Sequence, residues 1–427
     1  MRQWQDLHRD ATIVDLHSHP TLKASLFRRD MAQDKFGGLS RIFKAAFWPP
    51  AVRSNFPTME RGGLDVGLAT AYIPEWDWFQ DLPLLKVAKW LNRKAWKEYI
   101  AAPYYEATNR MLDLLEEQAA DYNRYIRTSR EFPYTEFRPL TIAKSRHALD
   151  EALDRGDMCL VHSVEGGHSL QCSDIGKLTA DDLEDADFDK ISPVAIENLN
   201  ALWQRGVAYL TLAHFYPNIC AYPCFPYPEY ALKFARKSRL HDKWDHNKGL
   251  TPTGVAVVER MFELGMLVDI THCTPPARSR VYQLATHHNA TSQIIATHMG
   301  AKAINPDTYC LEDWEIKWLA DNGGVVGVIF MNYWLSPVDT KMGMKYVTST
   351  IEHLHKVGGE DVIAMGCDLD GFTDPPDELA DMSKFPRLTR ELAALHSGPG
   401  TPTFSDEAIK KIMGGNSLRV LREGWKR

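Results

Sequence analysis

Seven residues of the kinds that bind divalent metal ions each follow a short apolar run in this sequence. A single residue in such a place is more often an ordinary buried polar group, so it is their recurrence that indicates a shared site. Imidazole nitrogens and carboxylate oxygens are common zinc ligands, and metal ions held this way activate water and polarise carbonyl groups. The chemistry indicated is therefore hydrolysis, and the residues are His17, His19, Glu165, His214, His272, His298 and Asp368.

The first two of these histidines are separated by a single residue. His17 and His19 come at the end of the β-branched run 12–16. In a strand, residues i and i+2 point to the same face, so both imidazoles should aim at one point. We therefore expect this pair to bind one metal ion.

The apolar runs that position these residues alternate with segments long enough to form helices. Near-continuous apolar runs are typical of strands buried on both faces, and alternating strands and helices predict a parallel sheet. Eight such units predict a (β/α)8 barrel of the TIM type. The expected strands are residues 12–16, 66–74, 157–164, 207–213, 266–271, 293–297, 323–330 and 362–367.

In such barrels the catalytic groups lie at the carboxyl ends of the strands, where they converge on one mouth. Six of the eight expected strands end in one or two of the seven residues. These are more ligands than one catalytic zinc needs, which is three protein groups and an open position. The surplus predicts two zinc ions per chain with a carboxylate bridging them, a binuclear arrangement that favours hydrolysis.

The chain is longer than such a barrel requires, and the surplus falls in two stretches. We expect insertions at about 82–155, where residues 82–130 have helical spacing, and at about 215–250. A helix should follow, capped by Thr251 and ended by Gly265. No stretch resembles a linker, so residues 1–427 are expected to form a single domain.

The composition is that of an ordinary globular protein, with 44% hydrophobic and 25% charged residues. A net charge of −7 gives no reason to expect a nucleic acid or an anionic membrane as partner. The seven cysteines are odd in number, which argues against a disulfide framework. The sequence begins without a secretory signal pattern and has no uninterrupted apolar span, so we expect a cytoplasmic protein.

Several short motifs, in this order, resemble those of the membrane (renal) dipeptidase family, which are zinc peptidases of the amidohydrolase superfamily. Together they extend over nearly the whole chain, and as a set they are highly specific. They are Val14-Asp15-Leu16-His17-Ser18-His19-Pro20, Glu165-Gly166-Gly167-His168-Ser169, Leu210-Thr211-Leu212-Ala213-His214, 249–254, 265–272, Thr297-His298, Gly366-Cys367-Asp368-Leu369-Asp370-Gly371 and 414–420.

The resemblance implies a role for each residue. The first metal ion would be bound at the His17 position, Glu165 would bridge the two zinc ions, and His272 with His298 would bind the second. His214 would contact the substrate and stabilise the tetrahedral intermediate. Asp368 would take a proton from the bridging water and pass it to the leaving amine. The implied reaction is hydrolysis of the amide bond of dipeptides by a metal-bridging hydroxide, often with tolerance for a D-residue or dehydro-residue on the C-terminal side. The family often forms dimers, and the Trp-rich stretch 82–130 would suit a homodimer interface.

The sequence departs from the family pattern at two positions. The first motif of the family usually reads His-x-Asp, and His19 takes the place of that aspartate as the expected ligand. The family also has an arginine shortly after the His298 position that pairs with the substrate carboxylate, whereas residues 299–307 contain none. Lys302 is the expected substitute in substrate binding, as a point charge without the two-pronged geometry of arginine.

Two other functions remain open at this point. The missing arginine and the aromatic residues of the long loop favour a metal-dependent amidohydrolase acting on a modified peptide or a non-peptide amide. A non-catalytic barrel used for binding is the third hypothesis, and the presence of Glu165, His272, His298 and Asp368 together argues against it. The aromatic residues of the loop are Phe215, Tyr216, Tyr222, Phe225 and Tyr227.

Overall fold

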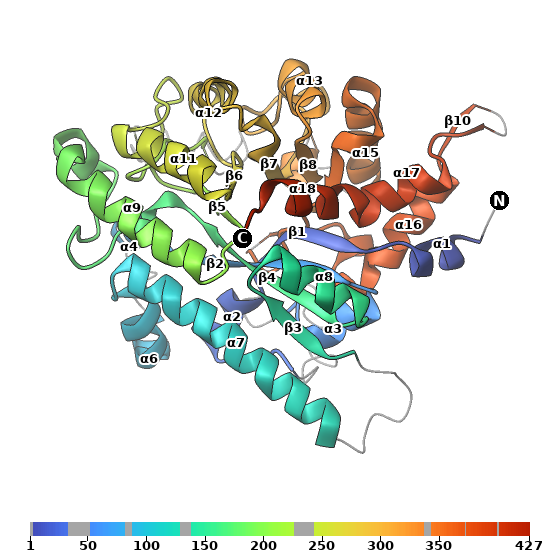
Figure 1. The fold of residues 1–427 in the computed structure, drawn as a ribbon, viewed down its shortest axis with the longest axis horizontal. Coiled ribbons are helices and arrows are strands. Elements are labelled where there is room, and N and C mark those ends of the chain that lie inside the picture. The colour runs from blue at the N-terminus through green and yellow to red at the C-terminus, as the bar shows by residue number, and fades with distance from the viewer. Residues whose placement is uncertain are drawn as a thin grey trace.

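Eight parallel strands form a nearly closed barrel in the computed structural model, which describes residues 3–32, 52–81, 88–128, 138–225, 243–336, 343–371, 373–398 and 401–427. Each of the eight expected apolar runs overlaps one strand, and helices surround them (Figure 1). The strands are β1 (Val14–Ser18), β2 (Val66–Tyr72), β4 (Met158–Glu165), β5 (Tyr209–Thr211), β6 (Leu267–Asp269), β7 (Ile294–Met299), β8 (Val325–Val328) and β9 (Ile363–Met365).

The strands pair in chain order around the barrel, from β1 through β2, β4, β5, β6, β7 and β8 to β9. A parallel bridge between Ser18 and Leu369 joins the first strand to the segment that follows the last one. All strand pairs of this sheet are parallel, and every strand residue of the eight is buried. The predicted TIM-type barrel is therefore confirmed.

A ninth strand, β3 (Leu140–Ala143), was not predicted. It pairs in parallel with residues 158–161 of β4, whereas β5 pairs with Val164 and Glu165 near the end of the same strand. The strand is only four residues long and its two central residues are half-buried. Because this segment is short and partly exposed, it has no apolar run of the kind that identified the other strands.

Helices cover the outside of the barrel (Figure 1). The expected capping of one of them is confirmed: Thr251 accepts a hydrogen bond from the amide of Gly254, and Gly265 ends the helix at φ 68°. The helices are α1 (Trp4–Asp10), α2 (Pro20–Phe27), α3 (Phe56–Arg61), α4 (Trp76–Asp81), α5 (Ala88–Leu91), α6 (Arg93–Ala95), α7 (Tyr104–Thr128), α8 (Arg146–Asp154), α9 (Phe188–Gln204), α11 (Pro252–Leu264), α12 (Pro275–His287), α13 (Asp313–Asp321), α14 (Asn332–Leu335), α15 (Met344–Gly358), α16 (Phe385–Ala394), α17 (Asp406–Lys410) and α18 (Asn416–Gly424). The short strands β10 (His396–Gly398) and β11 (Thr401–Pro402) form a separate antiparallel pair.

The helical stretch expected over 82–130 is not one continuous helix. Short helices α5 and α6 lead into a π-helical turn at 96–100, and the long helix α7 begins only at Tyr104. Pro103 directly before it explains the break, because proline has no amide hydrogen to donate within a helix but fits its first turn. Residues 82–87 and 129–137 lie outside the described part of the chain.

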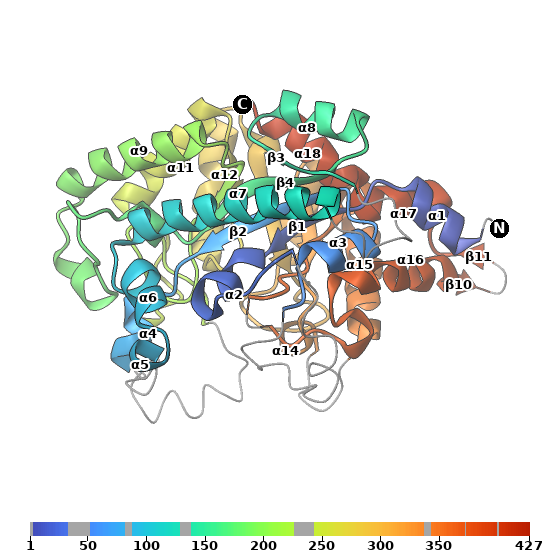
Figure 2. The ribbon, with the colours of Figure 1, turned by 90° about the horizontal axis from the view of Figure 1, so that it is seen from below.

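The two ends of the barrel differ in polarity. At one end, apolar strand side chains form a cluster with Leu418, Val420, Leu421 and Trp425, from α18 and the residue after it. Helix α14 lies at the opposite end (Figure 2), and its residues Tyr333 and Trp334 line one cavity with several of the polar residues described below. All seven cysteines are buried with free thiols. Among the described residues, no helix combines the length and the apolar character needed to span a membrane.

A buried carboxylate in α4 makes a testable contribution to stability. Asp77 is 2% exposed, accepts a hydrogen bond from the amide of Ala180 at 3.1 Å and lies 3.3 Å from Lys243 Nζ. Burial raises the pKa of Asp77 to about 6, against the opposing effect of Lys243.

The folded protein therefore holds a proton on Asp77 between about pH 4 and pH 6 that the unfolded chain has already lost. The free energy of unfolding should fall as the pH rises through this window. Asparagine does not titrate, so the Asp77→Asn variant should not show the decrease in the free energy of unfolding that Asp77 causes between about pH 4 and pH 6. For a pKa difference of two units this decrease is about 3 kcal/mol. Urea unfolding of both proteins at pH 4 to 7 measures the difference, and parallel curves would contradict it.

Candidate metal centre

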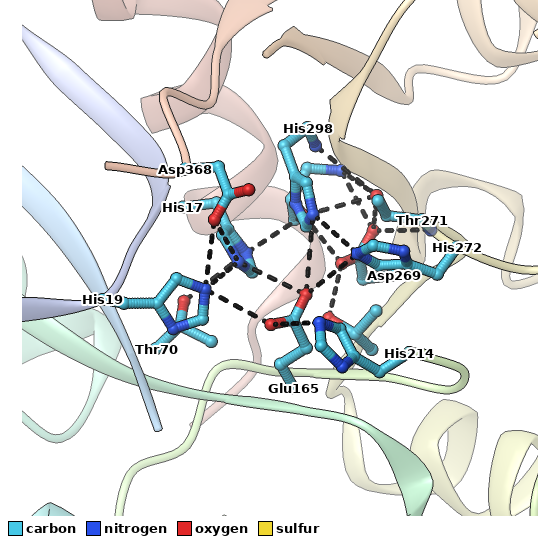
Figure 3. Close-up of polar contacts among 12 residues, drawn as sticks. His17, His19, Thr70, Glu165, His214, Asp269, Thr271, His272, His298 and Asp368 are labelled. Carbon is cyan, nitrogen blue, oxygen red and sulfur yellow. Dashed lines mark hydrogen bonds and ion pairs between the residues drawn. The ribbon is translucent and has the colours of Figure 1, made fainter. Parts of the chain in front are cut away.

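The seven polar residues predicted from the strand ends come together at the α14 end of the barrel (Figure 3). Each of them is at most 5% exposed. Glu165, the last residue of β4, lies in the middle of the group, with the five imidazoles around it and Asp368 beside His19. The seven residues therefore converge at one mouth of the barrel, as its topology predicts.

An irregularity in β1 places the first pair of histidines. The pairing of β1 with β2 shifts register between Asp15 and Ser18, and such a bulge re-aims the side chains that follow it. The strand ends at Ser18, and His19 is already the N-cap of α2. The Nε2 atoms of His17 and His19 nevertheless lie 3.0 Å apart, so both rings aim at one point as expected.

Both carboxylate oxygens of Glu165 face imidazole nitrogens. Oε1 lies 3.4 Å from His17 Nε2, 3.4 Å from His272 Nε2 and 3.5 Å from His298 Nε2. Oε2 lies 3.2 Å from His19 Nε2 and 3.5 Å from His214 Nε2. Oε1 is buried and yet accepts no hydrogen bond, which is unusual for a carboxylate oxygen and leaves it available to a cation.

These separations suit a divalent metal ion. Zinc ligands about 2 Å from the ion in a tetrahedral arrangement are roughly 3.3 Å from one another. The observed distances between donor atoms, including 3.1 Å between His272 Nε2 and His298 Nε2, lie close to that value. Three overlapping groups of residues are close enough to hold an ion: His17 with Glu165 and His298, His17 with His19 and Asp368, and Glu165 with His214 and His272.

The groups share His17 and Glu165, so they do not separate into the two ligand sets expected from the resemblance. The chemistry of the donors nonetheless fits a metal centre, because imidazole nitrogens and carboxylate oxygens are usual zinc ligands. How many ions bind, and of which element, is treated below as a proposal.

Tyr209 of β5 fixes the orientation of His17. Its hydroxyl donates a hydrogen bond to the carbonyl of Leu16 at 3.0 Å and lies 2.7 Å from His17 Nδ1. This contact holds the His17 ring with Nδ1 toward Tyr209 and Nε2 toward Glu165. Such outer partners set the tautomer of metal-binding histidines.

The histidines differ in their affinity for protons. Burial lowers the pKa of His272 below its usual value, and that of His298 well below it, so both rings are neutral, as metal ligands must be. For His19, burial acts in the same direction, but the neighbouring carboxylates of Asp368 and Glu165 outweigh it and raise the pKa to about 10. Burial would raise the pKa of Glu165, yet the surrounding histidines, His214 first, hold it well below its ordinary value.

Backbone strain is concentrated at the same place. His272, Asp368 and Asp370 have positive φ angles of 66°, 52° and 69°, which non-glycine residues rarely adopt. At Gly371, a Cβ atom would lie 2.1 Å from Asp368 Oδ1, so only glycine leaves room for that carboxylate. Strained residues persist where surrounding structure holds them, and here Asp370 is held by a buried ion pair with Lys23 at 2.9 Å.

A cavity of about 70 Å³ opens above the candidate metal ligands. His19, Glu165, His214, His272 and Asp368 contribute to its lining, so all of them can meet a bound molecule. The remaining lining is largely aromatic and includes Tyr72, Trp78, Phe215, Met331, Tyr333, Trp334, Gly371 and Thr373.

Lys302, the expected partner of a substrate carboxylate, is not among the lining residues. Its ammonium group pairs with Glu312, and its side chain is one-third exposed. Within the described part of the chain, the lining includes no lysine or arginine. Lys302 therefore does not lie at the cavity as expected, whereas the other predicted site residues do come together.

The aromatic loop contributes less to the cavity than its composition suggested. Phe215 lines it, but Tyr216 and Phe225 pack against Trp244 in a cluster that Phe215 and Trp78 adjoin. Tyr222 lies beneath the ammonium of Lys248. Tyr227 lies outside the described residues.

One polar residue next to the site was missed by the sequence analysis. Glu75 follows β2 by three residues, is 2% exposed and accepts a hydrogen bond from His214 Nδ1 at 2.9 Å. Its position after a strand is the same signal that identified the other residues. It was overlooked because the expected strand 66–74 ends in Ile73 and Pro74 and not in a polar residue.

Comparison with known proteins agrees with this geometry. The profile of the membrane dipeptidase family, peptidase family M19, matches residues 193–425. An uncharacterised protein from the pqqA 5′ region of Klebsiella pneumoniae is 35% identical over 184 residues, which are 42% of this chain and 63% of that protein. Human dipeptidase 3 is 26% identical over 266 residues, which are 62% of this chain and 44% of the relative. The chain thus spans about half the length of the curated relatives it matches.

A solved structure shows the same fold over the full length. A metallo peptidase from Rhodobacter sphaeroides, liganded with a phosphinate mimic of the dipeptide L-Ala-D-Ala, superposes with a TM-score of 0.66. The superposition covers 97% of this chain and 99% of that one at 20% sequence identity. At this identity the likeness extends to the fold alone.

Proposed function

The chain belongs to the membrane dipeptidase family, peptidase family M19, and from this premise we propose that it hydrolyses the amide bond of dipeptides at a binuclear zinc centre. The observation that carries the proposal is the position of Glu165, a buried carboxylate surrounded by five imidazoles on the floor of a cavity. A residue that only stabilised the fold would not need five imidazoles around its two carboxylate oxygens.

His17 and His19 would bind one zinc ion, His272 and His298 the other, and Glu165 would bridge them. When bound, the ions would supply a Lewis acid for the substrate carbonyl and lower the pKa of a water molecule. Glu165 supplies the negative charge that two adjacent cations need. The neutral state of His272 and His298 lets both rings offer a lone pair without first losing a proton.

Asp368 and His214 would act directly on the reacting groups, Asp368 by proton transfer and His214 by a hydrogen bond. Both line the cavity, and the side chain of each is almost completely buried. Asp368 would accept a proton from the attacking water and deliver it to the leaving amine, as a carboxylate within reach of both can do. Burial would lower the pKa of His214, but the carboxylates of Glu165 and Glu75 outweigh it and raise that pKa above its usual value. With a proton on each ring nitrogen, His214 would donate from Nε2 to the carbonyl oxygen of the substrate as negative charge develops on it.

Removal of bound metal tests this proposal. Dialysis against a chelator should lower the rate of dipeptide hydrolysis at least 100-fold, because the proposed reaction depends on the ions, and readdition of zinc should restore it. The melting temperature should also fall, since a ligand at 100 times its Kd stabilises the folded state by about 2.7 kcal/mol. Metal analysis should find about two zinc ions per chain. A metal-loaded protein that hydrolyses no substrate would contradict the proposal and favour a barrel used for binding.

A second candidate function is supported by the cavity itself. Its walls are largely aromatic, and no lysine or arginine of the described residues faces it, so a free substrate carboxylate would not meet the arginine that the family uses or a lysine in its place. An amidohydrolase acting on a modified peptide or a non-peptide amide would need no such partner. Comparing each dipeptide with its C-terminal amide separates the two: equal or faster hydrolysis of the amide favours the second function.

Several earlier expectations stay predictions. These are the single domain over residues 1–427, the homodimer through residues 82–130 and the cytoplasmic location. Substrate binding by Lys302 is the one site role that the present geometry does not support, because its ammonium group is occupied by Glu312 outside the cavity lining.

A further inference from the structure

Glu75 lies next to His214 but has no role in the reaction proposed above. Its carboxylate accepts three hydrogen bonds and is 2% exposed. Oε1 accepts from His214 Nδ1 at 2.9 Å and from the amide of Phe215 at 3.0 Å, and Oε2 accepts from the Tyr72 hydroxyl at 2.5 Å. These bonds connect the end of β2 to the segment that follows β5.

The first of these bonds determines which nitrogen of His214 faces the cavity. With Nδ1 bonded to Glu75, the opposite nitrogen, Nε2, is turned inward and lies 3.5 Å from Glu165 Oε2. The ring is also held by its neighbours: Phe215 stacks on it at 3.9 Å between ring centroids, and Tyr72 lies at 4.2 Å. Two rings alone would permit a 180° flip of the imidazole, whereas the hydrogen bond to Glu75 selects one orientation.

Glu75 is ionised in this environment. Burial would raise its pKa, but the charge and hydrogen bond of His214, with smaller effects of His168 and Tyr72, lower it to about 2. A charged acceptor makes a stronger hydrogen bond than a neutral one, so the selection of the ring orientation is firm.

We propose that Glu75 is a positioning residue that holds His214 with Nε2 directed at the substrate carbonyl. This inference rests on the proposed function, because only there does His214 meet a substrate. The competing account is structural: through Phe215 and Tyr72, Glu75 would merely fasten the segment after β5 to the end of β2.

The two accounts differ in a double-mutant cycle. If Glu75 acts through His214, Glu75→Ala should lower kcat by about 10- to 100-fold, the usual loss for such an outer partner, with KM changed less than about 3-fold. Glu75→Gln keeps an oxygen that accepts from Nδ1 and should recover part of the loss. In the His214→Ala background, Glu75→Ala should have no further effect on kcat. An equal loss in both backgrounds would overturn the proposal.

Asp77→Asn is the matched control. Asp77 lies two residues from Glu75, is equally buried and fastens the same segment to Ala180 and Lys243, but has no contact with His214. This variant should change the free energy of unfolding and leave kcat within about 2-fold, since its site is outside the cavity. A loss of kcat as large as that of Glu75→Ala would mean that any loosening of this segment slows the reaction, which overturns the proposal.

A spectroscopic measurement tests the proposal without activity. An imidazole Nδ1 proton bonded to a buried carboxylate should give a low-field proton signal in the NMR spectrum of 15N-histidine-labelled protein. The signal should disappear in His214→Ala, which assigns it, and in Glu75→Ala, and it should persist, shifted, in Glu75→Gln. Its absence from the wild type would overturn the proposed orientation. If the wild type hydrolyses no substrate, the proposed function fails, and this comparison alone decides whether Glu75 orients the ring.

Discussion

Replacement of Glu165 by glutamine is expected to abolish hydrolysis and to remove most of the bound metal. The carboxylate is 1% exposed and lies within 3.5 Å of the Nε2 atoms of all five site histidines. Glutamine has nearly the same shape but no negative charge, so two cations would lose the carboxylate that lies between them. We expect kcat/KM to fall by at least about 1000-fold, which corresponds to roughly 4 kcal/mol of transition-state stabilisation.

Metal analysis and kinetics on the same sample test this expectation. Glu315→Gln is the matched control, because Glu315 is an equally buried carboxylate that pairs with Arg278 outside the cavity lining. That change breaks a buried ion pair and should lower the melting temperature, but it should leave the metal content and kcat near their wild-type values. A Glu165→Gln protein that keeps two ions per chain and most of its activity would exclude Glu165 as a bridge.

The barrel and most of its site could be predicted from sequence because both depend on local patterns. A strand buried on both faces must be apolar nearly throughout, so β4, β7 and β9 are visible as runs without any knowledge of their partners. Once the runs are known to be parallel strands of one barrel, topology alone gathers their carboxyl ends. That is why His17, His272 and His298, far apart in the chain, were expected to meet.

The features that were missed depend on contacts between distant segments. The register shift around His17 is a property of the pairing of β1 with β2 and has no signature in residues 14–18 alone. The role of Glu75 becomes visible only when His214 is placed beside it. Likewise, whether a lysine such as Lys302 reaches the cavity depends on which acidic side chain is nearer, and that is Glu312.

Replacement of Asp368 by asparagine is expected to slow hydrolysis strongly while leaving the metal in place. Asp368 Oδ1 lies 3.2 Å from His19 Nε2 and 3.9 Å from His17 Nε2, at the edge of the metal-binding group and in the lining of the cavity. Asparagine has nearly the same shape as aspartate and fits the space beside Gly371. Its amide group, however, cannot accept and release a proton as a carboxylate does. Loss of a general acid–base group lowers kcat by about 100- to 10,000-fold.

The metal content of this variant decides between two roles for the same side chain. Asp368 also belongs to a group with His17 and His19 that is compact enough to hold an ion, so its carboxylate is a possible ligand as well as an acid–base group. A variant that retains two zinc ions but has lost turnover identifies proton transfer as the role of Asp368. A variant that has lost one ion identifies a ligand, and the negative charge that His19 does not provide to the first metal position would then come from Asp368.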